Sequence, residues 1–128
     1  MIYLDSCAVI KLLVPEPESA ALGMWLSQAA EPLVSSELLQ VEVHRTLIRL
    51  GAAEQLHAIT DELLASITAL PLARVLASAS RLPNPSLRSL DALHLATALS
   101  IKSTRFVTYD ERLAAAATEA GLAVVGPS

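Results

Sequence analysis

The chain is poor in several residue types, and each shortage narrows what the protein can be. Its single cysteine, Cys7, cannot form an internal disulfide, so the sequence predicts a cytoplasmic location. Aromatic residues make up only 3% of the chain, too few for an extensive platform on which nucleic-acid bases could stack. No uncharged stretch approaches the roughly 18 residues that a membrane-spanning helix needs. The apolar start lacks the basic region that opens a signal peptide.

Charge and hydropathy narrow the class further. The net charge of −4 argues against a protein that coats nucleic acid through one broad basic surface. It leaves a metal-dependent nuclease open, because bound cations reverse the sign of the local field. Hydrophobic residues make up 53% of the 128 residues, and the mean hydropathy is +0.51. We therefore expect one domain, residues 1–128, with surplus apolar surface for subunit or partner contacts.

Short apolar runs alternate with stretches of helical spacing. The runs predict strands at residues 2–4, 33–34, 72–75, 105–108 and 122–125. The helical stretches predict helices at residues 8–14, 18–29, 35–50, 53–69, 90–101 and 111–120, with a short helical piece before residue 82. Ser89 is expected to cap one of these helices, and Gly51 and Gly121 to end two others. The alternation indicates a three-layer α/β/α fold with a short, mainly parallel sheet of four or five strands.

Four acidic residues stand where they contribute little to a core. Asp5 and Asp110 directly follow predicted strands, Asp91 lies in a first helical turn, and Glu42 interrupts an apolar helix. Each has an ordinary explanation. The aspartates can cap helices or interact favourably with the helix dipole, and Glu42 can pair with an arginine of its own helix.

Taken together, the four positions favour a shared site. In a parallel α/β sheet, ligands bind beyond the carboxyl ends of the strands, where Asp5 and Asp110 are both expected. Four ionised carboxylates in that crevice repel one another unless their pKa values rise or a cation compensates them. Oxygen-only ligands select Mg²⁺ or Mn²⁺, and such an ion activates water for metal-assisted phosphodiester hydrolysis.

Four segments that contain these acids resemble the motifs of the PIN-domain family, especially the VapC ribonuclease toxins of type II toxin–antitoxin pairs. The segments match in order and spacing and lie at residues 1–13, 36–47, 87–99 and 106–113. The resemblance implies a PIN-like fold and a sequence-selective endoribonuclease that uses Mg²⁺ or Mn²⁺. It also implies a cognate VapB-like antitoxin that silences the enzyme.

The same resemblance implies roles for the acids. Asp5 and Asp91 would be the principal metal ligands, and Asp110 would complete the site directly or through water. Glu42 would position or deprotonate the attacking water.

Neighbouring residues have expected roles as well. Ser6 and Thr108 resemble the hydroxyl residues that hold carboxylates or metal-bound water in place. The family often has Thr then Ser where this chain has Ser6 and Cys7, so the first hydroxyl is kept. Cys7 is expected to be a small buried residue rather than a nucleophile, because no histidine lies near it in sequence.

Histidines and arginines are weaker candidates. His94 can bond the nearby Asp91, but a core or interface position is the favoured explanation. Arg112 closely follows Asp110, so it is our preferred contact for RNA phosphate, against the ordinary explanation of solvated surface charge. The other arginines considered are Arg45, Arg49 and Arg88, and the histidines without metal-ligand spacing are His44 and His57.

Two rival functions use the same features. A receiver-like signalling domain also gathers acids at strand ends, but Asp61 and Lys102 are poorly placed for its phosphorylation site. A catalytically inactive PIN-fold binding module has no reason to keep four repelling charges. The apolar helical stretches at residues 20–30 and 90–101 suggest a homodimer and a groove for an antitoxin segment.

Overall fold

The computed structural model describes residues 1–128 as a five-stranded sheet with seven α-helices and one short 3-10 helix. The elements follow in the order β1 (Ile2–Leu4), α1 (Ser6–Leu13), α2 (Ser19–Gln28), β2 (Leu33–Ser36), α3 (Leu38–Arg49), α4 (Glu54–Ala65), β3 (Thr68–Leu70), η1 (Leu72–Arg74), α5 (Leu76–Ser80), α6 (Ser89–Ser100), β4 (Arg105–Val107), α7 (Glu111–Glu119) and β5 (Val124–Val125). The strand order is β3-β2-β1-β4-β5, and every neighbouring pair is parallel. The predicted three-layer α/β/α fold is confirmed, with five strands.

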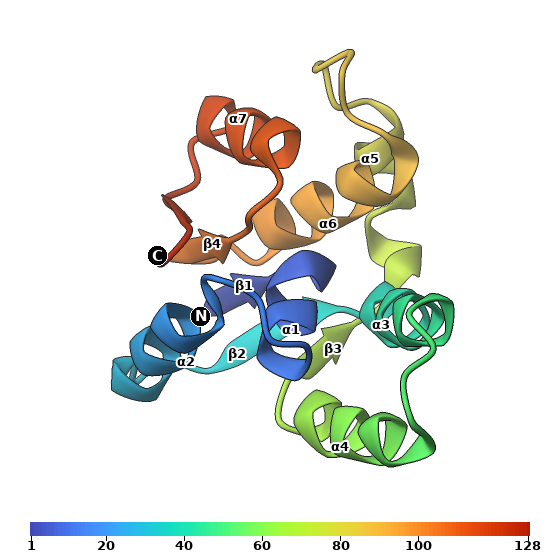
Figure 1. The fold of residues 1–128 in the computed structure, drawn as a ribbon. Coiled ribbons are helices and arrows are strands. Elements are labelled where there is room, and N and C mark those ends of the chain that lie inside the picture. The colour runs from blue at the N-terminus through green and yellow to red at the C-terminus, as the bar shows by residue number, and fades with distance from the viewer.

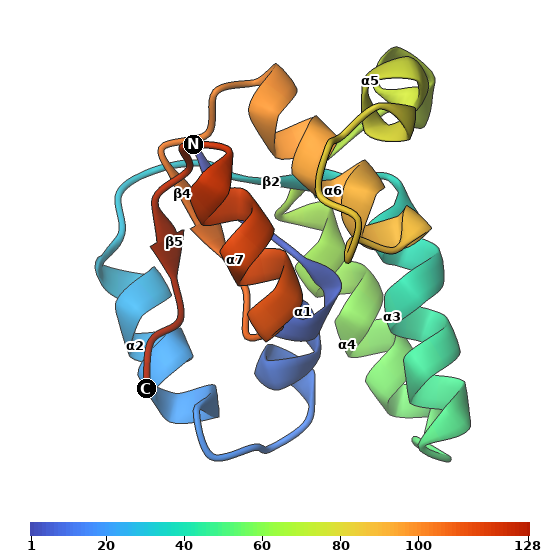
Figure 2. The same ribbon diagram turned by 90° about the horizontal axis from the view of Figure 1, so that it is seen from above.

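The sheet separates two hydrophobic cores because side chains alternate between its faces. Ile2 and Leu4 enter the core shared with helices α1 to α4, and Tyr3 enters the core shared with α6 and α7. Figure 1 shows α6 and α7 on one side of the sheet and α2 and α4 on the other. Within these layers α3 packs beside α4, and α5 beside α6 (Figure 2). Burial on both faces explains why β1 is a continuous apolar run.

The central position of β1 creates a crevice at one edge of the sheet. The chain leaves β1 through α1 on one face, and it leaves the neighbouring β4 through α7 on the other face. Connections that diverge in this way open a crevice at the carboxyl ends of the two strands, where α/β proteins bind ligands. Asp5 and Asp110 begin these two connections.

The third strand lies earlier than predicted. Residues 68–70 form β3, whereas residues 72–75, the predicted strand, contain the 3-10 helix η1. The helix predicted at residues 53–69 accordingly ends at Ala65. The cause of the error is that β3 is an edge strand whose first two residues are exposed. The uncharged stretch at residues 63–73 covers both the end of α4 and β3, so its composition does not separate them, and β3 forms because its backbone pairs with β2.

Two helix starts also differ from the prediction. Ser35 and Ser36 belong to β2, because they pair with residues of β3, and the buried Ser35 hydroxyl also donates to the Leu4 carbonyl of β1 at 2.6 Å. Helix α3 begins at Leu38, whose N–H donates to the Ser36 hydroxyl at 3.1 Å. Ser89 is the first residue inside α6, and no side chain caps this helix. Its start is exposed, so the free N–H groups reach water.

Other expectations about the chain are met. Gly51 and Gly121 end α3 and α7 with φ angles of +69° and +93°, the left-handed region that favours glycine. The strand order differs from the 2-1-3-4-5 order of receiver domains, so the receiver-like alternative is wrong. None of the helices combines the length and the apolar character that crossing a membrane requires.

Candidate active site

Asp5 is fixed at the start of α1 by three neighbours. Its Oδ1 accepts from the Ala8 N–H at 2.9 Å, which makes Asp5 the N-cap of α1. Its Oδ2 accepts from the Thr108 hydroxyl at 2.5 Å, and the Cys7 thiol lies 3.0 and 3.1 Å from the two oxygens. The Thr108 hydroxyl in turn accepts from the Asp110 N–H at 3.1 Å. The capping explanation therefore holds for Asp5, and the same carboxylate also joins β1 to the end of β4.

These contacts leave Asp5 with capacity for one further partner. A carboxylate offers about four lone-pair positions, and the Cys7 thiol carries a single hydrogen, so three donors leave one position open. Asp5 is 3% exposed, and burial raises its pKa, while the donors from Cys7, Thr108 and Ala8 act in the opposite direction. A cation at the open position would offset the cost of this buried charge.

Glu42 lies in the middle of α3 and contacts both α6 and α1. Its Oε1 lies 2.5 Å from Nε2 of His94, and its Oε2 accepts from the Ser6 hydroxyl at 3.4 Å. His94 is 1% exposed, and its Nδ1 lies 2.7 Å from the Tyr3 hydroxyl. The expected core histidine is confirmed, but its carboxylate partner is Glu42 rather than Asp91. The ion pair between Glu42 and an arginine of α3 does not form.

Asp91 and Asp110 line one polar pocket of about 520 Å³ that has no hydrophobic residue in its wall. Asp91 lies in the first turn of α6, and its carboxylate accepts no hydrogen bond from the protein. Asp110 caps α7 through Oδ1, which accepts from the Leu113 N–H at 2.9 Å, and its Oδ2 has no partner. Asp91 and Asp110 therefore contribute three unengaged carboxylate oxygens to this pocket, and Glu111 lines it as well.

The four acids are near enough to influence one another. The pKa of Asp91 is raised, first by burial and then by the negative charges of Asp110, Asp5 and Glu42, while His94 opposes the rise. The arrangement is nevertheless open, because no three His, Cys, Asp or Glu side chains lie close enough to hold a metal ion between them. The fold thus gathers the predicted acids in one region without closing a coordination shell.

The donor atoms of this site are carboxylate oxygens, which suit a hard divalent cation. Carboxylate oxygens are the ligands that Mg²⁺ and Mn²⁺ prefer. Mg²⁺ usually keeps several waters and binds proteins through one or two carboxylates rather than through a complete cage. Asp91 and Asp110, with their three unengaged oxygens, meet that requirement without a third direct ligand from the protein.

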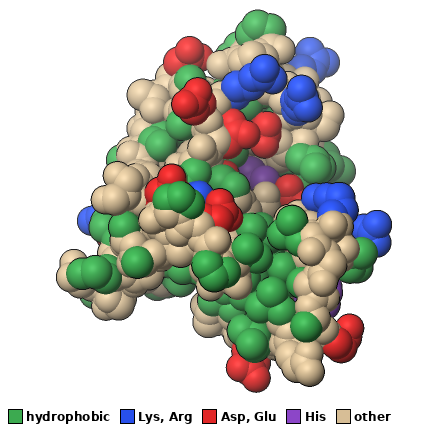
Figure 3. Space-filling view, in the orientation of Figure 1, with side chains coloured by type: hydrophobic (Ala, Val, Ile, Leu, Met, Phe, Trp, Pro, Cys, Tyr) green, Lys and Arg blue, Asp and Glu red, His purple; other side chains and the backbone are tan.

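Two arginines lie beside these acids. Arg88 and Arg112 are exposed, line the same polar pocket and form no ion pair within the protein. Arg45 and Arg49, the other arginines considered, lie on α3 and do not line it. Figure 3 shows acidic side chains and a histidine gathered in the middle of this face, with basic side chains beside them. The pocket therefore presents both signs of charge to a ligand.

Cys7 is half-buried rather than fully buried, but it has the chemistry expected of a structural thiol. Burial, followed by the charge of Asp5, raises its pKa to about 12. The thiolate is the reactive form of cysteine, so this thiol is a poor nucleophile. Its contacts with Asp5 and with the Tyr109 N–H place it as a packing residue between β1 and β4.

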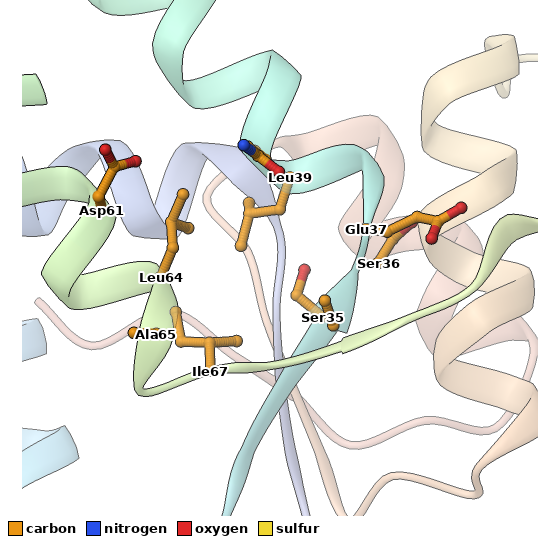
Figure 4. A pocket seen from close by; sticks show the side chains of 10 residues that line it. Ser35, Ser36, Glu37, Leu39, Asp61, Leu64, Ala65 and Ile67 are labelled. Carbon is orange, nitrogen blue, oxygen red and sulfur yellow. The ribbon is translucent and has the colours of Figure 1, made fainter.

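A second cavity, of about 300 Å³, lies among β2, α3 and α4, where Ser35, Leu39 and Leu64 are part of its wall (Figure 4). None of the four acids lines it. His44 and His57 connect the same two helices, with ring centroids 5.0 Å apart, and His44 also bonds Asp61 at 2.8 Å. Neither histidine takes part in the acidic site.

Comparison with known proteins decides the family. The family model of the PIN domain matches residues 2–119. The chain belongs to the PIN-domain family. Two ribonucleases of Mycobacterium tuberculosis resemble this PIN domain along nearly their whole length. Ribonuclease VapC35 is 44% identical over 133 residues, covering 99% of this chain and 97% of that protein. Ribonuclease VapC46 is 45% identical over 130 residues, covering 99% and 98%.

A solved structure supports the fold of this PIN domain. The crystal structure of Mycobacterium tuberculosis VapC20, described as a toxin that cleaves the sarcin–ricin loop, matches with a TM-score of 0.79. The match covers 99% of this chain and 100% of that one, at 14% identity. At this identity the match shows the shared fold alone.

The contact that the sequence prediction missed is the bond between Tyr3 and His94. A signal for it exists in β1, where Tyr3 is the only residue with a polar group. The pleat of the strand places Tyr3 on the face opposite to Ile2 and Leu4, which is the face covered by α6. A buried tyrosine hydroxyl usually has a hydrogen-bond partner, so the pattern of β1 indicates a polar residue on the helix that covers this face, which is His94 of α6.

Proposed function

We propose that this PIN domain is a metal-dependent endoribonuclease toxin of the VapBC type, which hydrolyses phosphodiester bonds in RNA. The observation that carries the proposal is the polar pocket in which Asp91 and Asp110 keep unengaged oxygens beside Arg88 and Arg112. Carboxylates suit a divalent cation and arginines suit a phosphate, so the pocket offers partners for both. The identities of 44% and 45% to ribonucleases VapC35 and VapC46 support the same chemistry.

Mg²⁺, or Mn²⁺ in its place, would be held directly by Asp91 and Asp110, and Asp5, which the resemblance gives as a principal ligand, would reach the ion through water. The bound ion supplies charge neutralisation for the phosphodiester and activation of water. Thr108 keeps Asp5 in place through its 2.5 Å hydrogen bond. This arrangement follows the expectation that ligating carboxylates are themselves hydrogen-bonded by neighbouring groups.

Glu42 would orient the attacking water and take its proton. Its Oε1 is occupied by His94, whereas Oε2 has only the long contact with Ser6. Oε2 is therefore the oxygen that can accept a hydrogen bond from water. A general base must reach the proton that it removes within hydrogen-bond distance, directly or through one water.

Arg112, with Arg88 beside it, would bind the RNA phosphate next to the scissile bond. Both guanidinium groups are exposed and lie at the pocket that contains Asp91 and Asp110. Phosphate contacts of this kind position a nucleic acid without reading its sequence. The preferred cleavage sequence therefore depends on other parts of the cleft.

The test is cleavage of a mixed RNA pool whose product ends are sequenced, with Mg²⁺, with Mn²⁺ and with EDTA. We expect defined cleavage sites with either metal and none with EDTA. The matched control is the Asp91→Asn protein purified in the same way, which exposes a contaminating nuclease. Cleavage that persists in EDTA, or that is equal in the variant, would contradict the proposal.

We also propose a homodimer and a VapB-like antitoxin as partners, acting in the cytoplasm where RNA is available. The apolar stretch at residues 90–101 offers little surface for such contacts, because residues 94–98 are buried within the monomer. The support is a set of large apolar side chains on the surface, namely Met24, Val41, Ile48, Leu50, Ile59, Leu76 and Leu90. Exposed apolar surface commonly serves protein contacts. Light scattering after size exclusion at micromolar concentration measures the assembly, and a strict monomer would contradict the dimer.

A further inference from the structure

A buried chain of hydrogen bonds connects the sheet to Glu42. The Tyr3 hydroxyl of β1 lies 2.7 Å from Nδ1 of His94, and Nε2 of His94 lies 2.5 Å from Oε1 of Glu42. Tyr3 is 0% exposed and His94 is 1% exposed. The chain ends in the acidic site, because the Glu42 charge acts on Asp91. Three layers of the fold, β1, α6 and α3, thus meet in one line of contacts.

The donors along this chain follow from chemistry. Burial raises the pKa of the Tyr3 hydroxyl, so it stays protonated and has a hydrogen to donate to Nδ1 of His94. Neutral imidazole has one donor and one acceptor nitrogen, so Nε2 then carries the hydrogen and donates to Glu42. In the opposite tautomer an unprotonated Nε2 would face the ionised carboxylate at 2.5 Å, and two lone pairs would repel.

We infer that His94 is a positioning residue for Glu42 and that Tyr3 sets its tautomer. The inference rests on the proposed ribonuclease function and assigns a role to two residues outside the four acids. Glu42 has a long, flexible side chain in the middle of α3, and His94 holds one of its oxygens. The other oxygen, Oε2, is thereby presented to water in one orientation. Neighbouring groups that orient a working carboxylate act in this way.

Helix α6 gives the arrangement its rigidity. Asp91 and His94 are three residues apart on α6, so they lie on neighbouring positions of one helix face. Asp91 lines the open pocket, while His94 is buried beneath it. One helix therefore sets the position of a proposed metal ligand and that of the group that orients the proposed base. A shift of α6 would disturb both together.

The test compares two substitutions of His94 that differ in one donor. His94→Gln keeps an amide N–H that reaches toward Glu42, whereas His94→Leu has similar bulk and no donor. We expect His94→Leu to lower kcat for RNA cleavage by about 10- to 100-fold, with KM for RNA unchanged, and His94→Gln to recover much of that loss. Tyr3→Phe should lower kcat by a smaller factor.

A packing control separates orientation from stability. Leu95→Val alters a buried residue of the same helix that does not touch Glu42. It should lower the unfolding temperature while kcat, measured well below that temperature, stays at the wild-type value. If His94→Gln and His94→Leu lose kcat equally, or if folded His94→Leu keeps the wild-type kcat, the positioning role is refuted.

Nitrogen NMR of the His94 ring in the RNA-free wild type tests the tautomer independently of cleavage. We expect hydrogen on Nε2 and none on Nδ1. An active wild type whose Nε2 carries no hydrogen refutes the positioning role alone, because His94 then has no donor for Glu42. An inactive wild type with the expected tautomer refutes the ribonuclease proposal, and the role of His94 in catalysis falls with it.

Discussion

Asp5 and Asp91 belong to one acidic region, but the protein holds them differently. Asp5 is 3% exposed and accepts hydrogen bonds from Ala8 and Thr108, with the Cys7 thiol alongside. Asp91 is half-buried, accepts no hydrogen bond from the protein and lines an open polar pocket. Asp5 is therefore part of the framework of the fold, whereas Asp91 is attached to it only through its backbone.

The difference shows two ways in which a fold can hold a carboxylate in an acidic site, with compensating hydrogen-bond donors or without them. A buried carboxylate is tolerated only when donors compensate its lost hydration, as they do at Asp5. A partly buried carboxylate without donors is destabilised first by its lost hydration and then by repulsion from like charges, as the raised pKa of Asp91 indicates. Removing the first side chain should harm both fold and activity, while removing the second should harm activity alone.

The largest expected effect is on cleavage by the Asp91→Asn protein. The substitution removes a proposed metal ligand, so kcat/KM for RNA should fall by at least about 100-fold. The unfolding temperature should not fall, because no hydrogen bond to Asp91 is lost. Cleavage assays and thermal unfolding of the same preparation check both points. Wild-type activity in this variant would remove Asp91 from the site.

Asp5→Ala tests the difference between Asp5 and Asp91 through the free energy of unfolding. The loss of the N-cap of α1 and of the acceptor for the buried Thr108 hydroxyl should cost about 1–3 kcal/mol of unfolding free energy. Asp91→Ala, its matched control, should change the unfolding free energy by less than about 0.5 kcal/mol. Urea unfolding measures both values. Equal costs for the two variants would contradict the distinction drawn between these acids.

Thr108→Val tests whether the fixation of Asp5 matters for metal binding. The substitution keeps the shape and removes the donor to Asp5, so the Mg²⁺ concentration for half-maximal cleavage should rise by about 10- to 100-fold. Thr60→Val is the control, because Thr60 is equally buried and its hydroxyl bonds only the Leu56 carbonyl at 2.8 Å. If the wild type, Thr108→Val and Thr60→Val need the same Mg²⁺ concentration for half-maximal cleavage, Thr108 does not contribute to metal binding.

Arg112→Gln tests whether the pocket that contains Asp91 and Asp110 binds the phosphate of the RNA substrate. The loss of one exposed phosphate contact should raise KM for RNA about threefold, in keeping with an exposed ion pair worth under 1 kcal/mol. The slope of log Kd against log salt should also become shallower by about 0.7 for a single strand. Arg105→Gln, at the opposite end of β4, should leave both quantities unchanged. If Arg105→Gln also makes the slope of log Kd against log salt shallower, the change reflects the net charge of the protein and not a phosphate contact by Arg112.

The smallest effect is the pH dependence of stability in Asp91→Asn. Because the pKa of Asp91 is raised in the folded state, the folded protein keeps this proton to a higher pH than the unfolded chain does. The wild type therefore loses stability relative to the variant as pH rises from about 3.9 through the raised value. The variant should be the more stable protein at neutral pH, and the gain should vanish in acid. A gain that persists below the unfolded pKa would have another cause.

Much of the fold follows from local pattern. The continuous run of β1, the helical spacing of the stretches that follow and the glycines after α3 and α7 predict elements that the structure contains. The edge strand β3 could not be predicted in this way, since its first two residues are exposed and only pairing with β2 makes it a strand. Edge strands are defined by their neighbours more than by their own sequence.

Parts of the site can likewise be predicted from local sequence, and other parts depend on how distant elements pack. That Asp5 and Asp110 lie near each other follows from parallel topology, because both come directly after strands that turn out to be adjacent. The pairing of His94 with Glu42 depends on how α6 and α3 lie against the sheet, which no spacing within either helix reveals. The free oxygens of Asp91 likewise reflect the absence of hydrogen-bond donors from other parts of the fold, which the local sequence does not reveal.

The bond from Thr108 to Asp5 joins positions 103 apart in the chain. During synthesis the first strand and its acid leave the ribosome long before the residues that hold and accompany them. Under the proposed function, an unfinished polypeptide lacks Asp110 and the anchored form of Asp5 until residues 108–110 have emerged. Products that terminate before Thr108 would then be harmless to the cell that makes them.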